Sequence, residues 1–241
     1  MNLLIKPQKD SQQIVSVTPA SAGWHYISFS AYQLAPGGTV TLSDNSNELC
    51  AVVLSGIVSA QTEGHDWKEI GQRMSVFEDA APYAVYIPPR GKLTITAKTN
   101  AELGVADGRA KGELPARLIE PGAMRRSARG KGSNTRYVCD ILPLDEPAES
   151  VLVVEVRTSS GHSSSYPPHK HDIDMSPKRA SWRRLTTIES IRRRVLFSSA
   201  SIATHATLMS PWPSEIVMLF WCLAATTPWW SLMVMSPITL M

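Results

Sequence analysis

Short runs of β-prone residues recur through the first 174 positions of this 241-residue chain, and they restrict its fold more than any other feature. Between them stand Pro-Gly-Gly, Ser-Asp-Asn-Ser-Asn, Pro-Pro-Arg-Gly and Ala-Asp-Gly, which contain the residue types of tight turns. Spacings of about ten residues are typical of a sandwich or barrel, and nothing resembles repeated strand–helix–strand units. The sequence therefore predicts an all-β protein with strands over 25–34, 38–42, 48–56, 74–77, 83–88, 92–97, 136–142 and 151–158.

Two segments look like the paired strand motifs of a cupin, a small jelly-roll barrel. They are PGGTVTL (36–42) followed by LCAVVLSG (49–56), and VYIPPRGKLTITA (85–97). A metal-binding cupin carries His-x-His between the first two pieces and a further histidine after the Pro-x-Gly turn. Here the first gap reads SDNSNE (43–48) and the last strand has no histidine. We therefore expect a metal-free N-terminal barrel that serves as a scaffold or a dimer contact.

The sharpest signal for chemistry is SSSYPPHKHD (163–172), which contains His169 and His171. On a β-strand, residues two apart point to the same face, so both imidazoles can bind one divalent ion. Pro167 and Pro168 keep the preceding backbone extended. A solvated surface pair of histidines is the alternative explanation of the same pattern.

Three consecutive segments closely resemble 5-deoxy-glucuronate isomerase of myo-inositol catabolism, a bicupin family. They are RGKGSNTRYVCDILP (129–143), VLVVEVRT (151–158) and SSYPPHKHD (164–172). The resemblance begins at NLLIKP near the start and extends to about Asp174.

The resemblance implies an aldose–ketose isomerisation, in which 5-deoxy-D-glucuronate becomes 5-dehydro-2-deoxy-D-gluconate through an enediol-type intermediate. It also implies that His169 and His171 bind a divalent metal, Zn or Mn, which polarises the carbonyl, while a base moves the proton between adjacent carbons. The substrate carboxylate needs a cation, and Lys170 or Arg136 could supply it, although both are equally suited to be solvated surface charges. The sequence does not assign a catalytic residue.

The composition changes sharply near residue 175. The last 67 residues contain no Gly, Asp, Asn, Gln or Tyr, yet they hold five of the seven tryptophans and six of the nine methionines. Residues 1–174 have a net charge of −2 and residues 175–241 a net charge of +5. The basic balance therefore belongs to the tail, and we do not interpret it as a nucleic-acid signature.

A shift of reading frame just after Asp174 would explain this tail. Read offset by one frame, its codons permit Glu-Glu-Thr-Tyr-Tyr-His and Gly-Tyr-His-Pro segments, which carry the family's remaining metal ligands and are absent from this chain. Trp has a single codon, so Trp229 and Trp230 force a valine at their junction, while 226–228 permits His-Pro. We therefore predict an out-of-frame tail.

The sequence predicts a bicupin architecture of two jelly-roll barrels. We expect a metal-free N-terminal barrel over 1–140, the start of a C-terminal barrel with the His-Lys-His motif over 141–174, and an out-of-frame, disordered or irregular tail over 175–241. The truncated second barrel lacks the carboxylate ligand and the third imidazole, so we expect impaired or absent isomerase activity. The alternatives are a non-catalytic cupin fragment that binds a sugar acid or nothing, and an iron-dependent cupin oxygenase.

The remaining expectations concern location and partners. The start lacks a secretory signal, and three cysteines are too few for a disulfide framework, which together indicate the cytoplasm. The apolar stretch 217–227 ends at Pro228 and is shorter than the roughly 20 residues of a membrane span. We expect a small sugar-acid substrate, no nucleic acid, no membrane, and a possible homo-oligomer.

Overall fold

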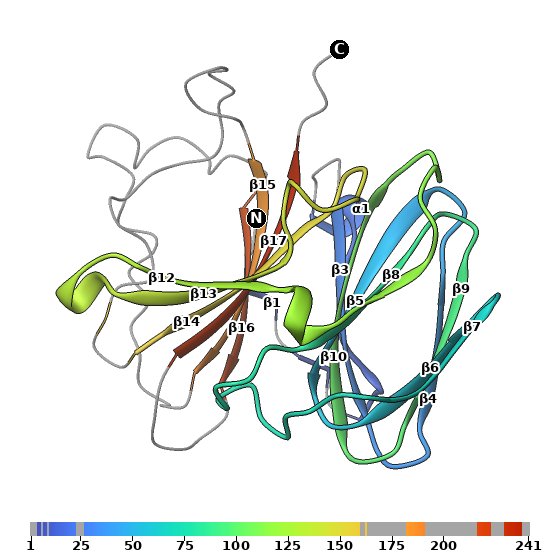
Figure 1. Cartoon of the computed structure of the whole chain (residues 1–241), viewed down its shortest axis with the longest axis horizontal. Helices are drawn as coiled ribbons and strands as arrows, with labels where there is room; N and C mark the ends of the chain where they lie inside the picture. Colours follow the sequence, from blue (N-terminus) through green and yellow to red (C-terminus); the bar gives the residue numbers. More distant parts are fainter. Residues whose placement is uncertain are drawn as a thin grey trace.

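Three β-sheets stacked as layers make up the molecule (Figure 1). The computed structural model describes residues 4–5, 7–8, 10–22, 27–159, 162, 182–190, 216–222 and 229–237, with backbone alone for the first and the last three of these ranges. A six-stranded sheet forms the middle layer. Its strands, in spatial order, are β11 (Arg117–Ile119), β8 (Tyr83–Ile87), β5 (Asn47–Ser55), β10 (Ala101–Arg109), β3 (Ile27–Leu34) and β2 (Gln13–Val17).

The outer layers are a four-stranded and a seven-stranded sheet. The four-stranded sheet has the order β4 (Thr39–Ser43), β9 (Lys92–Ala97), β6 (Val58–Thr62) and β7 (His65–Ile70). The seven-stranded sheet has the order β1 (Leu4–Ile5), β16 (Ile216–Cys222), β15 (Trp182–Ser190), β17 (Trp229–Pro237), β14 (Leu152–Thr158), β13 (Arg136–Leu142) and β12 (Arg125–Arg129). The short helices are α1 (Pro19–Ala22), η1 (Pro121–Ala123) and η2 (Gly132–Asn134).

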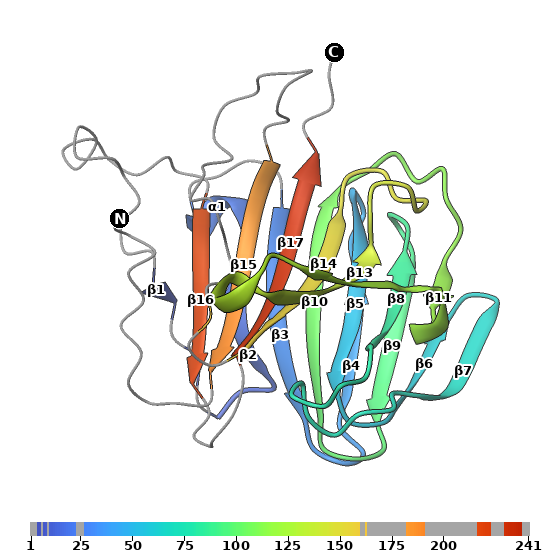
Figure 2. The same cartoon turned by 60° about the vertical axis from the view of Figure 1, so that its left-hand side comes forward.

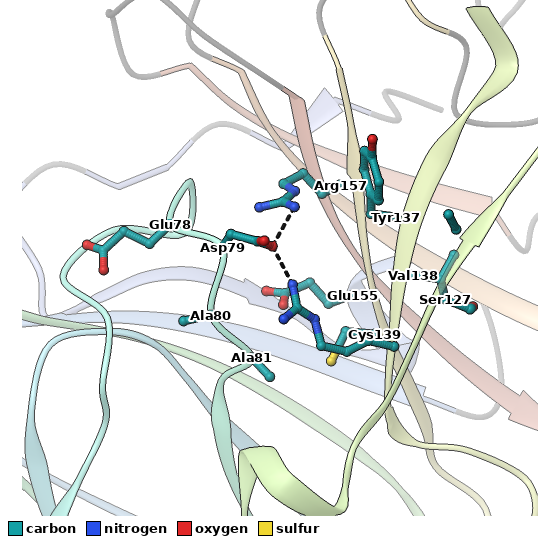
Figure 3. A pocket seen from close by; sticks show the side chains of 12 residues that line it. Glu78, Asp79, Ala80, Ala81, Ser127, Tyr137, Val138, Cys139, Glu155 and Arg157 are labelled. Carbon is teal, nitrogen blue, oxygen red and sulfur yellow. Dashed lines mark hydrogen bonds and ion pairs between the residues drawn. The ribbon is translucent and has the colours of Figure 1, made fainter. Parts of the chain in front are cut away.

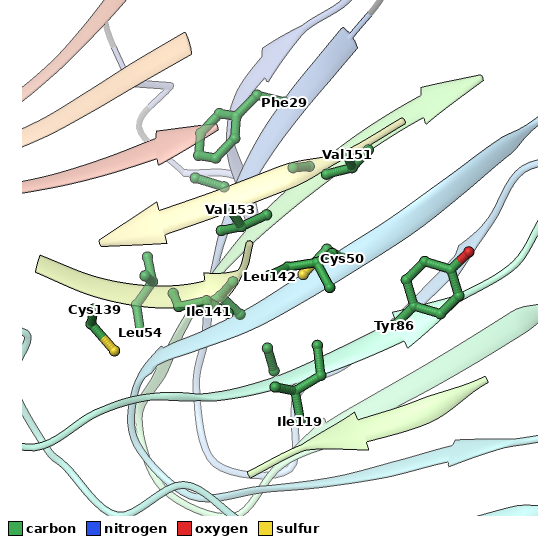
Figure 4. Packing of buried hydrophobic residues seen from close by; sticks show 14 of the residues in the cluster. Phe29, Cys50, Leu54, Tyr86, Ile119, Cys139, Ile141, Leu142, Val151 and Val153 are labelled. Atoms are coloured by element: carbon green, nitrogen blue, oxygen red, sulfur yellow. The ribbon is translucent and has the colours of Figure 1, made fainter. Parts of the chain in front are cut away.

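The middle sheet is buried on both faces, and β5 shows how its sequence achieves this. Eight of its nine residues are buried, and successive side chains alternate between the two outer layers. Leu49, Ala51 and Val53 pack in the cluster facing the four-stranded sheet, whereas Cys50 and Val52 pack against β13 and β14 (Figure 4). A continuous apolar run is what a strand buried on both faces requires.

Strand β10 lies at the centre of the middle sheet, between β5 and β3, but the sequence pattern does not reveal it. Its Ala-Asp-Gly segment has the composition of a turn, yet these residues pair with β5 and β3. Gly108 faces the segment before β14, where an added Cβ would lie 2.6 Å from Ser150 Oγ. The glycine is therefore needed for close packing between layers and does not mark a turn.

The predicted strand over 74–77 is wrong, because these residues lie in a loop between β7 and β8. We call residues 71–81 the β7–β8 loop. It begins at Gly71, whose φ of +121° favours glycine, and where an added Cβ would lie 2.1 Å from the carbonyl oxygen of Gly56. The loop leaves the barrel there and runs toward β14.

Strand β14 lies between β13 and β17 in the seven-stranded sheet. It pairs antiparallel with β17 from Leu152↔Met235 to Thr158↔Trp229, and β17 pairs in turn with β15 (Figure 2). The predicted irregular tail thus contains three strands, since backbone pairing does not depend on a particular set of side chains and Trp, Val and Ile are β-prone. The rest of the tail lies outside the described residues, and its predicted out-of-frame origin stays a prediction.

Two further observations bear on the domain organisation. The predicted boundary between residues 140 and 141 falls within β13, whose partners on either side are β12 and β14. No helix in the described part of the chain is long and apolar enough to cross a membrane.

Candidate functional site

Strands β12, β13 and β14 carry the described residues that come shortly before the predicted His-Lys-His motif in the chain. Arg136, the first residue of β13, pairs with Thr158, the last residue of β14. From Thr158 the chain continues toward the His-Lys-His motif, but His169, Lys170 and His171 lie outside the described residues. The structure thus places Arg136 beside the strand end from which that motif departs, and it does not test the two predicted ligands.

Arg136 is half-buried and only lightly held. Its Nη1 donates a 3.3 Å hydrogen bond to the backbone oxygen of Asn134. Opposite it, Thr158 is buried, and its Oγ1 has no hydrogen-bond partner among the residues that the structure describes. The Arg136 guanidinium therefore has hydrogen-bonding capacity left over for a polar group of a ligand.

The described side chains contain no group of three or more His, Cys, Asp or Glu residues placed to hold a metal ion. Cys50 and Cys139 are both free and buried, and burial raises the pKa of each thiol to about 12. They are therefore protonated near neutral pH and are not thiolate ligands. A metal site would depend on His169, His171 and residues outside the described ranges.

A cavity of about 250 Å³ opens between the β7–β8 loop and strands β12–β14 (Figure 3). We call it the interlayer cavity. Its charged and polar lining comes from both sides, and its walls also include small apolar residues. The lining residues are Glu78, Asp79, Ala80, Ala81, Arg126, Ser127, Ala128, Tyr137, Val138, Cys139, Glu155 and Arg157.

The floor of the interlayer cavity holds a buried ion pair between Arg73 and Glu155. Arg73 Nη2 lies 2.7 Å from Glu155 Oε1, and Nη1 lies 3.1 Å from Oε2. Burial raises the pKa of Glu155, and the charge and hydrogen bonds of Arg73 oppose that rise. Arg73 also donates to the backbone oxygens of Leu54 and Ala80, so it fastens the loop to two layers.

At the mouth of the cavity, two guanidinium groups meet one carboxylate oxygen. Arg157 Nη2 lies 2.5 Å from Asp79 Oδ1, and Arg126 Nη2 contacts the same oxygen. Partial burial acts to raise the pKa of Asp79, but Arg157 and Arg126 outweigh it and hold the pKa below its ordinary value. The guanidinium of Arg157 also stands over the ring of Tyr137, 5.2 Å from the centroid.

Comparison with known proteins decides what kind of protein this is. The model of the KduI/IolB family matches residues 3–186. The chain belongs to the KduI/IolB family. The resemblance predicted from the motifs between residues 129 and 172 is thereby confirmed.

Curated relatives of this KduI/IolB family chain are named 5-deoxy-glucuronate isomerase. The relative from Geobacillus kaustophilus is 43% identical over 180 residues, which cover 73% of this chain and 65% of that protein. The relative from Geobacillus thermodenitrificans is 45% identical over 159 residues, covering 66% of this chain and 58% of that protein. The chain thus spans less than two thirds of the length of these relatives.

Solved structures support the fold of this KduI/IolB family member. An IolB-like protein from Salmonella typhimurium LT2 is 31% identical, with a TM-score of 0.79 over 98% of this chain and 93% of that chain. A putative glyoxylate induced protein from Pseudomonas aeruginosa has a TM-score of 0.51 at 10% identity, covering 93% of this chain and 79% of that chain, and so shares the fold alone. The predicted all-β, cupin-like class is confirmed.

Sequence reasoning missed every charged residue of the interlayer cavity. Arg73 and Glu155 are separated by 82 positions, and Asp79 lies just after the predicted strand over 74–77. Each residue looks like an ordinary surface charge when read alone. The one available signal was Glu155 inside the apolar run VLVVEVRT, where a charge in a buried strand needs a partner.

Proposed function

We propose that this chain is built on the scaffold of an isomerase converting 5-deoxy-D-glucuronate to 5-dehydro-2-deoxy-D-gluconate, and that its own activity is impaired or absent. The observation that carries the assignment is the identity of 43–45% to relatives named 5-deoxy-glucuronate isomerase. The impairment is supported by the altered composition of 175–241.

The reaction needs two kinds of assistance. A proton leaves the carbon next to the aldehyde, an enediol forms, and a proton is delivered to the former aldehyde carbon while its neighbour becomes the ketone. A divalent metal, Zn or Mn, would supply stabilisation of the developing negative charge on oxygen. Of its ligands this chain retains His169 and His171, whereas zinc-type sites use three or four protein ligands. We therefore expect weak metal binding.

The substrate carboxylate needs a cation, and Arg136 is the described candidate. Arg136 pairs with Thr158 at the strand end that precedes the histidine motif, and its guanidinium has one 3.3 Å hydrogen bond to the Asn134 backbone oxygen. Thr158 Oγ1 has no hydrogen-bond partner among the described residues. A planar guanidinium suits a carboxylate because it can donate two parallel hydrogen bonds. Lys170 is the second candidate proposed from the sequence. The partner class is a small sugar acid, without nucleic acid or membrane, in a cytoplasmic and homo-oligomeric protein.

A restored reading frame provides the decisive experiment. The gene is sequenced around codons 172–178, and a version with the frame corrected after Asp174 is expressed beside the present chain. Both proteins are assayed for bound metal by mass spectrometry and for turnover of 5-deoxy-D-glucuronate. We expect about one tightly bound ion and turnover in the corrected protein alone. Turnover by the present chain at a rate near that of an intact relative would contradict the proposal.

The second candidate is a non-catalytic cupin fragment that binds a sugar acid or has no ligand. The composition of 175–241, which departs from that of the preceding residues, favours it. Sugar-acid binding without turnover by the metal-loaded chain would support it, and a tightly held metal ion together with turnover would exclude it.

A further inference from the structure

We propose that the interlayer cavity is a binding site for a small monocarboxylate, with Arg126 and Arg157 holding the ligand and Asp79 occupying their charge when it is absent. This inference does not rest on the proposed isomerase, because every residue of the cavity lies within 78–157. It assigns a role to the cavity between the β7–β8 loop and strands β12–β14, which nothing in the predicted His-Lys-His chemistry uses.

The arginine pair is the first step of the argument. Arg126 and Arg157 stand on β12 and β14, with β13 between them, and both reach a single oxygen, Asp79 Oδ1. Two guanidinium groups repel each other unless an anion lies between them. Asp79 supplies that anion from a loop, with 66% of its side chain exposed, whereas Arg157 is only 18% exposed. Arg126 is 47% exposed, so Arg157 is the more buried of the two cations that meet the loop carboxylate.

Tyr137 keeps the cation in place independently of Asp79. Its ring lies under the Arg157 guanidinium at 5.2 Å, and the two residues are direct partners across β13 and β14. Such a cation–π contact restrains the side chain while leaving its N–H groups available to an acceptor. When Asp79 moves away, Arg157 therefore remains at the mouth of the cavity.

The charges around the cavity select a singly charged ligand. The negative charge of Glu155 is neutralised by Arg73, so Glu155 does not act on the ligand. Glu78 adds a further carboxylate to the lining. Arg126 and Arg157 carry two positive charges, and Asp79 and Glu78 together carry two negative charges. A phosphate dianion in place of the Asp79 carboxylate would add a negative charge to this balanced lining. A monocarboxylate that replaces Asp79 leaves this balance unchanged, which is why we favour it over phosphate.

The volume and walls fit a small organic molecule. A cavity of about 250 Å³ lies just below the range typical of drug-sized ligands, so it suits a metabolite of a few carbon atoms. Ala80, Ala81 and Val138 provide apolar contact for its carbon skeleton. The Cys139 thiol is protonated near neutral pH, so the site binds its ligand without covalent chemistry.

Titration of the full chain with D-glucuronate tests the proposal, using calorimetry at low salt. Asp79→Asn removes the carboxylate that competes with the ligand for Arg126 and Arg157. We expect this variant to bind about fivefold more tightly, because in the unaltered chain Asp79 occupies the two arginines in a fraction of the molecules. Arg157→Met and Arg126→Met should each weaken binding by about tenfold or more, because each removes a charge-assisted contact.

Arg125→Met is the matched control. Arg125 adjoins Arg126 on β12, but it pairs with Asp145 and Asp140 and does not line the cavity. We expect its D-glucuronate affinity to equal that of the unaltered chain. Equal losses in Arg125→Met and Arg126→Met would show unspecific attraction and overturn the site. So would an Asp79→Asn protein that binds no better, or inorganic phosphate binding as tightly as D-glucuronate.

Discussion

Arg73 and Glu155 form a bidentate ion pair that joins the β7–β8 loop to β14, and their side chains are only 1% and 3% exposed. Arg73 belongs to the β7–β8 loop and Glu155 to the seven-stranded sheet. A charged pair at this depth is costly to form, but it leaves few alternative ways to dock the two layers. The pair therefore specifies where the loop that carries Asp79 is placed.

Glu155→Gln should destabilise the protein by about 3–5 kcal/mol, because the Arg73 guanidinium would stay buried without its counter-charge. Urea unfolding followed by circular dichroism measures the change. Glu69→Gln is the control, since Glu69 pairs with Lys98 at the surface with 73% of its side chain exposed, and it should cost less than about 1 kcal/mol. Equal, small effects of the two substitutions would show that the buried pair does not form.

Glu48→Gln should destabilise the protein by about 3 kcal/mol. The Glu48 carboxylate is fully buried and accepts hydrogen bonds from the amides of Ser150 and Val151 at 2.6 and 2.7 Å, and from Tyr86 Oη at 2.6 Å. A carboxamide would turn one acceptor into a donor that faces other donors. Tyr86→Phe removes a single contact and should cost about 1.5 kcal/mol in the same unfolding measurement. A smaller loss for Glu48→Gln than for Tyr86→Phe would contradict this account.

The sequence correctly predicted those strands whose own residues favour the β conformation, without help from neighbouring layers. β8, β9, β13 and β14 are dense in β-branched and aromatic residues and are bounded by turn residues, so local preference and burial agree. Strand β10 was not predicted because Gly108 serves packing between layers, a constraint that only the neighbouring layer reveals. Strands β6 and β7 were not predicted from the sequence because both contain polar residues on their exposed face.

The candidate site was predictable only in its local part. The His-Lys-His motif is contiguous, so spacing alone indicates it, and Arg136 followed from a contiguous family motif. The interlayer cavity combines a loop with three strands, and its residues become neighbours only through folding. Charges that meet in this way carry no periodic signal along the chain.

Gly71→Ala should destabilise the protein strongly, by about 3 kcal/mol, because a Cβ would meet the carbonyl oxygen of Gly56 and the φ of +121° is itself unfavourable. Gly64 is a matched control, since its φ is +80° but an added Cβ meets nothing within 4 Å. Gly64→Ala should cost about 1 kcal/mol, the backbone penalty alone. Thermal unfolding compares the two, and similar melting temperatures would refute the close approach at Gly71.

Glu149→Gln should remove part of the stability that the protein gains above acidic pH. Its carboxylate accepts backbone N–H groups of Gly112 and Glu113 at 2.8 and 3.0 Å. Partial burial acts to raise the pKa of Glu149, but these hydrogen bonds prevail and lower it below 4.5. A carboxyl whose pKa is lowered by folding stabilises the protein above its unfolded pKa, and this contribution is lost as the pH falls through the folded pKa. The variant and the parent should differ near pH 7 and converge as the pH falls through the lowered pKa of Glu149 in the folded protein. A difference that grows on acidification would have the wrong sign.

Deletion of residues 175–241 tests whether the tail pairs with β14. The deletion removes β17, so β14 would become an edge strand whose outward amides have no partner. Hydrogen exchange measured residue by residue should then be fast at alternate amides of β14 and remain slow at those that bond to β13. Amides of β5, in the middle sheet, are the internal control and should keep their protection, because β5 bonds to β8 and β10. Unchanged protection along β14 would mean that β17 does not occupy its edge. Protection lost across β5 as well would mean instead that the tail supports the whole fold, which an out-of-frame sequence has no reason to do.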